Sequence, residues 1–174
     1  MKQKVLITGI TGQDGVFLSS LLLKSNDYEI IGTSRVSEDA NIKKKLIYLG
    51  NDDNELENLK ITKCNLQDSN EIEALVESYK PDYVYNLIGP GSVSQSVEFP
   101  FENSNSIISS YNNLVNSFIK VKKFPKFFQT SSSEMFDDKG QESISEVTNF
   151  NPKTPYAISK MYCHNLSNFY KEKF

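Results

Sequence analysis

Tyr156 and Lys160 are the residues whose types and spacing most directly suggest chemistry. Side chains four residues apart on a helix project from the same face. A free tyrosine has a pKa of about 10 and is a poor base at neutral pH, but a neighbouring ammonium group favours the phenolate. Such a phenolate can take a proton from a substrate hydroxyl while hydride leaves the same carbon. The same spacing is also common on helix surfaces that have no catalytic role.

A second chemical signal lies near the start of the chain, where a short apolar and β-branched run ends at Thr8 and three glycines follow. An amphipathic segment begins at Val16, so the predicted order is strand, glycine turn, helix. In such a turn bare backbone can approach a pyrophosphate, and the amino end of the helix favours anionic charge. The alternative is an ordinary structural turn. The residues predicted to bind a dinucleotide here are Gly9, Ile10, Thr11, Gly12, Gln13, Asp14 and Gly15.

Strands and helices must alternate along the chain to position these residues. After a strand over 4–8, further strands are predicted over 28–35, 59–64, 82–88 and 126–130. Helices are predicted over 16–23, 68–80, 99–121 and 155–170, with an irregular connection containing one short helix over 38–58 and a long loop over 131–154. This alternation predicts an α/β fold with a doubly wound parallel sheet, in one dinucleotide-binding domain over 1–174.

The carboxyl ends of the strands form the ligand crevice in such a sheet. The second strand ends in Thr33, Ser34 and Arg35, with no acidic residue before Glu38. An acidic residue there favours NAD, whereas an arginine can pair with the extra phosphate of NADP. NADP is therefore the predicted cofactor, NAD stays possible, and Arg35 could also be an unpaired surface residue. The cofactor-binding residues predicted at the strand ends are Arg35, Asn65, Leu66, Leu87, Ile88 and Gly89.

Composition excludes several other classes of function. Charged residues make up 24% of the chain and the formal net charge is −3, so neither a nucleic acid nor an anionic membrane is an expected partner. Cys64 and Cys163 lie far apart without metal-like spacing, and His164 is the only histidine, so no metal site is predicted. Two unpaired thiols fit a reducing compartment, and a cytoplasmic location is expected.

Four motifs in order carry a family resemblance: residues 7–15, Tyr85-Asn86-Leu87, Ser132-Ser133-Glu134, and Pro152-x-x-Pro155-Tyr156-Ala157-x-x-Lys160. This set resembles the extended, sugar-nucleotide branch of the short-chain dehydrogenase/reductase superfamily (NAD-dependent epimerases and dehydratases), and within it the GDP-mannose 4,6-dehydratase family. The resemblance covers essentially the whole chain, but only the amino-terminal half or so of such an enzyme. It implies a Rossmann fold that lacks the usual carboxyl-terminal substrate domain.

The resemblance implies a role for each matching residue. Ser132 matches the family's catalytic Ser/Thr, Tyr156 its base, and Lys160 the partner of that tyrosine and a ribose contact. Glu134 matches the glutamate that separates dehydratases from epimerases; its alternative is a loop carboxylate facing water. The implied substrate is a nucleotide sugar, GDP-mannose above others. The implied reaction oxidises the sugar at C4, removes water across C5 and C6, and returns hydride to C6.

Several positions depart from the family pattern. Asn65 stands where an aspartate usually touches adenine, Val36 replaces a second arginine, and the stretch 88–92 differs from the usual small residues. The later strands and the small domain that grips the sugar nucleotide are not matched, so catalysis by this chain alone is doubtful and the fifth strand is expected at an edge.

Two other functions therefore stay open. One is a sugar-nucleotide epimerase or reductase of the same superfamily, in which Glu134 is incidental. The other is a non-catalytic dinucleotide-binding module. In each case the apolar faces of the helices near 99–121 and 155–170 resemble the superfamily's dimer bundle, and a homodimer is expected.

Overall fold

The computed structural model describes residues 1–36, 39–89, 93–136 and 143–173. Five strands form one sheet in this part of the chain: β1 (Gln3–Thr8), β2 (Tyr28–Ser34), β3 (Leu59–Lys63), β4 (Tyr83–Asn86) and β5 (Lys126–Gln129). Their order is β3-β2-β1-β4-β5, and every neighbouring pair is parallel. The strand order reverses between β1 and β4, and a ligand crevice is expected outside the carboxyl ends of the strands at that point.

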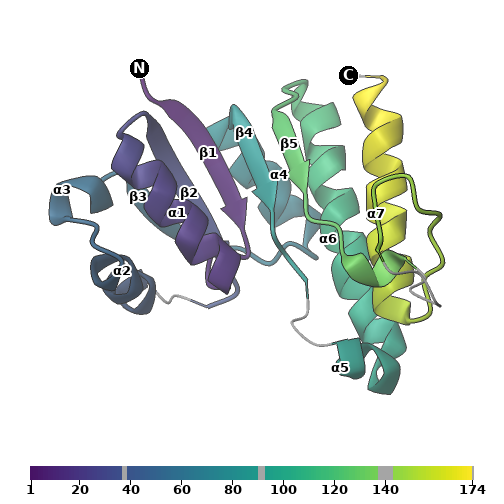
Figure 1. Cartoon of the computed structure of the whole chain (residues 1–174). Coiled ribbons are helices and arrows are strands. Elements are labelled where there is room, and N and C mark those ends of the chain that lie inside the picture. The colour runs from purple at the N-terminus through teal and green to yellow at the C-terminus, as the bar shows by residue number, and fades with distance from the viewer. Residues whose placement is uncertain (37–38, 90–92, 137–142, 174) are drawn as a thin grey trace.

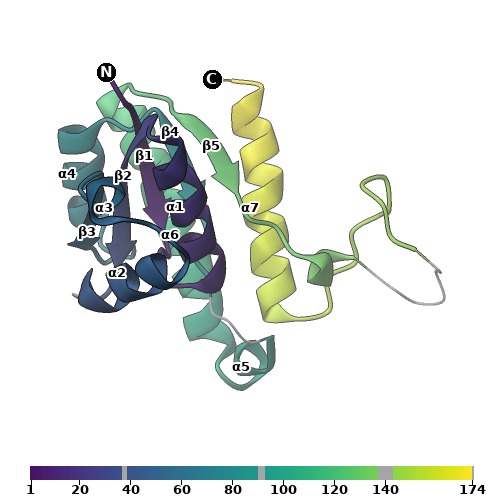
Figure 2. The ribbon, with the colours of Figure 1, turned by 60° about the vertical axis from the view of Figure 1, so that its left-hand side comes forward.

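Helices cover both faces of the sheet (Figure 1). One face carries α1 (Gln13–Ser25), α2 (Asp39–Tyr48) and α3 (Asp53–Leu56), and the other carries α4 (Ser69–Tyr79) and α6 (Pro100–Val121). The last helix, α7 (Pro155–Lys171), packs against α6 and beside β5. Figure 2 shows the short helix α5 (Val93–Glu98) below the strand tips, and the 3-10 turn η1 (Ser133–Met135) follows β5.

The central strands owe their burial to alternation of side chains between the two layers. Val5 and Ile7 of β1 pack in the cluster on the α1 side, while Leu6 packs in the cluster formed with α4 and α6. All three side chains have an exposed fraction of 0%. A strand that is covered on both faces reads as a continuous apolar run, as β1 does in the sequence.

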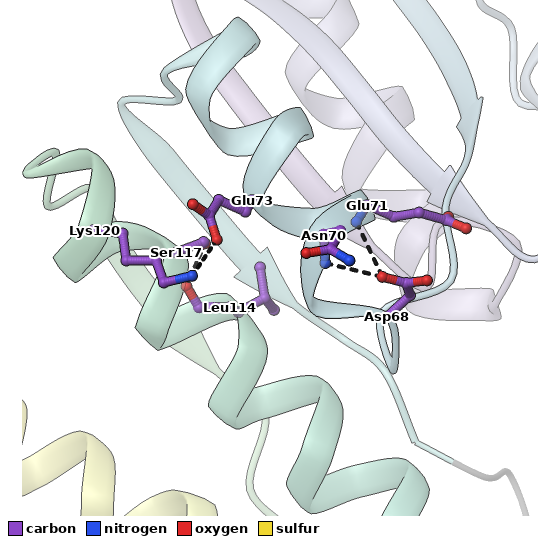
Figure 3. A network of polar contacts seen from close by, with 7 residues as sticks. All are labelled: Asp68, Asn70, Glu71, Glu73, Leu114, Ser117 and Lys120. Carbon is purple, nitrogen blue, oxygen red and sulfur yellow. Dashed lines mark hydrogen bonds and ion pairs between the residues drawn. The ribbon is translucent and has the colours of Figure 1, made fainter.

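Helix α4 makes two kinds of polar contact, a cap at its own amino end and an ion pair with α6 (Figure 3). Asp68 caps α4, because its side chain accepts hydrogen bonds from the backbone N–H groups of Asn70 at 2.9 Å and Glu71 at 3.3 Å. The Nζ atom of Lys120 on α6 lies 2.5 Å from the Oε2 atom of Glu73 on α4, at an exposed position where an ion pair contributes little. The apolar packing of residues such as Leu114 therefore holds the two helices together.

The predicted α/β class and the doubly wound parallel sheet are confirmed. The prediction of a single short helix over 38–58 was wrong, because both α2 and α3 lie there. The polar run before α3 is a capping box, in which Asp52 accepts from the N–H of Glu55 at 2.8 Å and Glu55 accepts from the N–H of Asp52 at 3.1 Å. Helix α5 was not predicted at all.

β5 lies at an edge of the sheet, as predicted, and the exposed fraction of Phe128 is 52%. Of the predicted loop 131–154, residues 137–142 lie outside the described residues, and so do Glu38 and residues 90–92. Throughout the described segments, every helix is too short or too polar to cross a bilayer.

Candidate active site

The glycine turn after β1 brings bare backbone to the point where the strand order reverses. Gly9 has φ of 73°, and a Cβ atom there would lie 3.2 Å from the backbone carbon of Leu87 after β4. A Cβ atom on Gly15 would lie 2.6 Å from the Cα atom of Ile10, so α1 packs directly on the turn. These two positions require glycine for different reasons, the first for backbone conformation and the second for close packing.

The side chain of Ile10 lies in the core and not in the crevice. Its exposed fraction is 0%, and it sits over Gly32 of β2, where a Cβ atom would lie 2.2 Å from its Cδ1 atom. Only the backbone of Ile10 remains for the predicted cofactor contact. The sequence reasoning missed Gly32, whose lack of a side chain makes room for the turn.

The amino end of α1 is open to an anion. Its N-cap residue is Gly12, and no side chain caps the helix there. The N–H groups of the first turn, including those of Gln13 and Asp14, have no intrahelical acceptor. Together with the helix dipole, this arrangement suits a phosphate group.

A cavity of about 500 Å³ lies over the carboxyl ends of β1 to β4 and is closed on one side by α5 and α6. This volume is typical of a small-molecule or cofactor site. Some of the residues predicted to bind the cofactor are not in its lining, namely Ile10, Gln13, Asp14, Gly15, Tyr156 and Lys160. The predicted cofactor-binding residues that do line it are Gly9, Thr11, Gly12, Arg35, Asn65, Leu66, Leu87, Ile88 and Gly89.

Ten further residues line the same cavity. For the five that lie between positions 99 and 110, the available signal in the sequence is a spacing of mostly three and four residues on a predicted helix, which places them on one face. The residues that were not predicted as site residues are Thr33, Ser34, Cys64, Gln67, Gln95, Phe99, Glu102, Asn103, Ser106 and Ser110.

The loop after β3 is shaped by its own side chains. The Oδ1 atom of Asn65 accepts a hydrogen bond from the N–H of Gln67 at 3.2 Å, and the N–H of Asn65 donates to Glu71 at 2.8 Å. Burial raises the pKa of the Cys64 thiol to about 11, so this group stays protonated at neutral pH. Arg35 is exposed at the rim of the cavity.

A buried amide joins the ends of three strands beneath the crevice. Asn86, at the end of β4, accepts a hydrogen bond from the hydroxyl of Thr8 at 2.5 Å and donates to Gln129 at 2.7 Å. The hydroxyl of Thr130 donates to the backbone carbonyl of Asn86 at 2.5 Å. This network holds β1, β4 and β5 in register where the loops depart, and a fully paired buried network of this kind is rigid.

Lys160 links α7 to the rim of the cavity. Its exposed fraction is 3%, and its Nζ atom donates to the carbonyl oxygens of Ile88 at 3.3 Å and Thr130 at 3.4 Å. The same atom lies 5.7 Å from the centroid of the Tyr156 ring. Burial lowers the pKa of Lys160. Lys160 is thus buried at the rim of the cavity and Tyr156 beside it is half-buried, so this pair does not stand on an exposed helix surface.

Ser132 and Glu134 lie just beyond β5, outside the cavity lining. The Oγ atom of Ser132 accepts a hydrogen bond from the N–H of Glu134 at 3.2 Å, and the N–H of Met135 donates to the carbonyl of Ser132 at 3.2 Å. Met135 is buried and anchors the turn, whereas Glu134 is exposed. The turn thus holds Ser132 partly buried and leaves the carboxylate of Glu134 in solvent.

His164 on α7 contacts the segment that follows β5. The Oγ atom of Ser131 lies 2.9 Å from the Nδ1 atom of His164, whose Nε2 atom lies 3.1 Å from the amide nitrogen of Asn168. The His164 ring also stands edge-on to Phe150 at 5.2 Å, and Phe150 pairs with Phe136 in an isolated antiparallel bridge. Among the described residues, no three His, Cys, Asp or Glu side chains gather closely enough to hold a metal ion.

The sequence resembles one family of known proteins along almost its whole length. A family model described as GDP-mannose 4,6 dehydratase matches residues 6–174. The chain is 32% identical over 179 residues to GDP-mannose 4,6-dehydratase from Vibrio cholerae, covering 100% of this chain and 47% of the relative. It is 33% identical over 174 residues to GDP-mannose 4,6 dehydratase 2 from Arabidopsis thaliana, covering 97% of this chain and 46% of the relative. The chain thus spans about half the length of these relatives.

Two solved structures share the fold. The UDP-Glc/GlcNAc 4-epimerase from Campylobacter jejuni has a TM-score of 0.81 at 22% identity, over 94% of this chain and 47% of the other. The UDP-N-acetylglucosamine 4-epimerase from Methanobrevibacter ruminantium has a TM-score of 0.78 at 27% identity, over 98% of this chain and 52% of the other.

Proposed function

Because the chain belongs to the GDP-mannose 4,6-dehydratase family, we propose that it is the cofactor-binding and catalytic part of an NADP-dependent sugar-nucleotide 4,6-dehydratase. GDP-mannose is the proposed substrate. The observation that carries the proposal is the position of Lys160, buried between the Ile88 carbonyl on the rim of the cavity and the ring of Tyr156. This position supports Tyr156 as the proposed base and Lys160 as the charged group that activates it.

The residues present fit a dinucleotide. The uncapped amino end of α1 and the backbone around Gly12 would hold the pyrophosphate, and the loop after β3 would hold the adenine. Arg35, exposed at the rim, would pair with the extra phosphate of NADP. When bound, the nicotinamide supplies a reversible acceptor for hydride.

The chain's own residues would move the protons. Tyr156 takes the proton of the C4 hydroxyl while Lys160 stabilises the phenolate, and Ser132 holds that hydroxyl in place. Oxidation at C4 makes the C5 proton acidic. Glu134 takes this proton and then, as the acid, assists departure of the C6 hydroxyl as water. Tyr156 returns its proton to C5 and hydride would return to C6, so the sugar loses one molecule of water with no net oxidation.

A second candidate is a non-catalytic dinucleotide-binding module. It is favoured by the exposed position of Glu134 and by the absence of Ser132 and Glu134 from the cavity lining. Binding of NADP without turnover of any nucleotide sugar is its expected behaviour.

Titration of the protein with NADP+ and NAD+, followed by incubation with GDP-mannose, separates these candidates. We expect NADP+ to bind about tenfold more tightly than NAD+, in line with one charge-assisted contact from Arg35. A 4-keto-6-deoxy product that disappears in Tyr156→Phe supports the dehydratase. In Glu134→Gln the expected result is oxidation at C4 without loss of water. Failure to bind either dinucleotide contradicts both candidates.

The proposed assembly is a homodimer through α6 and α7, in the cytoplasm. The exposed fractions of Phe101 on α6 and Ile158 on α7 are 85% and 51%, and such apolar exposure supports an interface. Cys64 and Cys163 are free and buried, which supports a reducing compartment. A monomeric mass in light scattering at micromolar concentration would contradict the dimer.

A further inference from the structure

Gln129, the last residue of β5, connects the buried network under the crevice to Lys160. Its Oε1 atom accepts a hydrogen bond from the side chain of Asn86 at 2.7 Å, and its Nε2 atom donates to the carbonyl oxygen of Thr130 at 2.9 Å. The Nζ atom of Lys160 donates to the same carbonyl oxygen at 3.4 Å. A backbone carbonyl has two lone pairs, so it can accept from both donors. The Thr130 carbonyl is therefore the point where the network and the lysine meet.

The Thr130 carbonyl also fixes the direction of every hydrogen bond in this network. A carbonyl can only accept, so the end of the Gln129 amide that faces it is the NH2 group. The Oε1 atom then faces Asn86, whose own NH2 group donates to it. This leaves the Oδ1 atom of Asn86 to accept from the hydroxyl of Thr8. Rotation of either amide by half a turn would bring like groups together, so both side chains are held in one orientation.

Lys160 depends on this carbonyl for its position. The exposed fraction of Lys160 is 3%, and its hydrogen-bond acceptors among the described residues are the backbone carbonyls of Thr130 and Ile88. The two distances, 3.4 and 3.3 Å, are longer than those of most N–H···O hydrogen bonds. A small rotation of the Thr130 peptide group would therefore deprive the ammonium of one acceptor.

Other contacts of Thr130 hold a different part of the residue. Its N–H donates to the carbonyl of Asn86 at 3.2 Å, and its hydroxyl donates to the same oxygen at 2.5 Å. These bonds fix the amino side and the side chain of Thr130. The carbonyl belongs to the next peptide group, in the segment that leaves the sheet, and the NH2 group of Gln129 is the neutral donor that orients it.

We propose that Gln129 is a positioning residue for Lys160. Its NH2 group holds the Thr130 carbonyl in the direction of the ammonium, and the amide of Asn86 holds Gln129 in turn. The ammonium is thereby kept 5.7 Å from the centroid of the Tyr156 ring. The inference rests on the proposed function, in which Lys160 activates Tyr156. It adds to that function a residue outside the cavity lining that acts through the lysine.

NMR spectroscopy of Lys160→Met without cofactor tests the shared carbonyl. Loss of the ammonium leaves Gln129 as the remaining side-chain donor to Thr130, so this hydrogen bond is expected to strengthen and the side-chain NH2 protons of Gln129 to shift downfield. The NH2 group of Asn51, which donates to Glu55 at 2.8 Å on the α1 side of the sheet, is the internal control. Unmoved Gln129 resonances would overturn the inference.

A double-mutant cycle of Gln129→Met and Lys160→Met tests whether the glutamine acts through the lysine. In Gln129→Met the Thr130 carbonyl is no longer oriented, so the ammonium loses an acceptor and the pKa of Lys160 is expected to fall further. Stability rises with pH between this folded pKa and the unfolded value. The rise in Gln129→Met, measured against the double variant, is therefore expected to begin at a lower pH than that of the parent measured against Lys160→Met. Tyr156 and Cys163, the titratable groups beside Lys160, are present in all four proteins.

Thr8→Val is the matched control, because it removes the far end of the network and leaves the Thr130 carbonyl in place. It is expected to lower the Tm but to keep the rise at the pH of the parent and the affinity for NADP+ unchanged. Gln129→Met is expected to bind NADP+ about fivefold more weakly, in line with one hydrogen bond.

The outcomes separate this inference from the proposed function. A glutamine that only supports the network would lower the Tm as Thr8→Val does and leave the rise at the same pH, and that result would overturn the inference alone. If Gln129→Met does not fold, the Gln129 resonances of Lys160→Met decide. A parent that binds neither NADP+ nor NAD+ removes the proposed function instead.

Discussion

The cavity around the glycine turn and the segment beyond β5 lie at the same end of the sheet but differ in how they are built. The cavity stands on β1, whose central side chains are fully buried, and its walls come from loops after four strands and from two helices. The β5-end segment, residues 130–136, follows an edge strand and leaves Glu134 exposed. A few contacts to α7, among them the pair Ser131–His164, hold it.

This difference separates the region proposed to bind the cofactor from the residues beyond β5 that are proposed to take part in the reaction. A site built on central strands is as rigid as the core, because its loops begin at strands whose backbone is buried and hydrogen-bonded on both sides. How firmly the residues of an edge strand are held depends on the elements that pack beside that strand. Cofactor binding can therefore be measured in this chain independently of turnover, and the following variants act on the two regions separately.

The largest expected effect is that of Gly15→Ala, at the glycine turn beside the cavity. A methyl group there meets the backbone of Ile10 at 2.6 Å, so the turn or α1 must shift. We expect the free energy of unfolding to fall by about 2 kcal/mol, despite the better helix propensity of alanine, and NADP+ binding to be lost. Denaturant unfolding and calorimetry measure both. Gly12→Ala, whose methyl group would meet only the Gly9 carbonyl at 3.3 Å, is the milder comparison.

Lys160→Met acts on the junction of the two regions. Burial lowers the pKa of Lys160, so its charged form is disfavoured in the folded state. Between the folded pKa and the unfolded value of about 10.4, the unfolded state binds more protons and the parent gains stability as pH rises. Lys160→Met lacks this rise and is expected to be about 1 kcal/mol more stable at neutral pH, with weaker NADP+ binding.

Unfolding of both proteins as a function of pH checks this prediction. The difference between them contains the titration of Lys160 and its effect on the neighbouring thiol of Cys163, whose pKa Lys160 lowers. Lys171→Met, at an exposed position of the same helix, serves as the control. The prediction would be contradicted if the parent lost stability relative to Lys160→Met as the pH rises toward the pKa of free lysine.

His164→Phe acts on the β5-end segment alone. The ring against Phe150 is kept, but the hydrogen bond to Ser131 is lost. We expect amide hydrogen exchange of Glu134 and Met135 to rise about tenfold, equivalent to about 1.4 kcal/mol, with NADP+ affinity unchanged. His164→Asn, which can still bond Ser131, is expected to retain slow exchange. Unaltered exchange in His164→Phe would show that other contacts hold the segment.

Phe128→Thr has the smallest expected effect on stability. The Phe128 ring is 52% exposed and touches Tyr85 with a centroid distance of 5.8 Å. We expect the free energy of unfolding to change by about 0.5 kcal/mol and NADP+ affinity to stay the same. Because the edge becomes less apolar, concentration-dependent light scattering is expected to fall. A large loss of cofactor affinity would show that the edge supports the cavity after all.

The sequence by itself determined the features that depend on neighbouring residues. The apolar run before the glycine turn predicts β1, and the amphipathic segment after the turn predicts α1. Thr154 and Pro155 predict the start of α7, where the Thr154 hydroxyl accepts from the N–H of Ala157 at 3.1 Å. The spacing of Tyr156 and Lys160 predicts a shared face. Caps, periodicity and helix spacing act within a few residues, so one sequence is enough to recognise them.

Only the tertiary structure decided which distant residues meet. It placed Gly32 under Ile10, joined Ser131 to His164, and brought residues of α6 to the cavity that the strand ends form. Each of these contacts depends on strand order and on how helices pack across the sheet. Such packing depends on the whole faces of the helices and of the sheet, so it cannot be predicted from any short stretch of the chain.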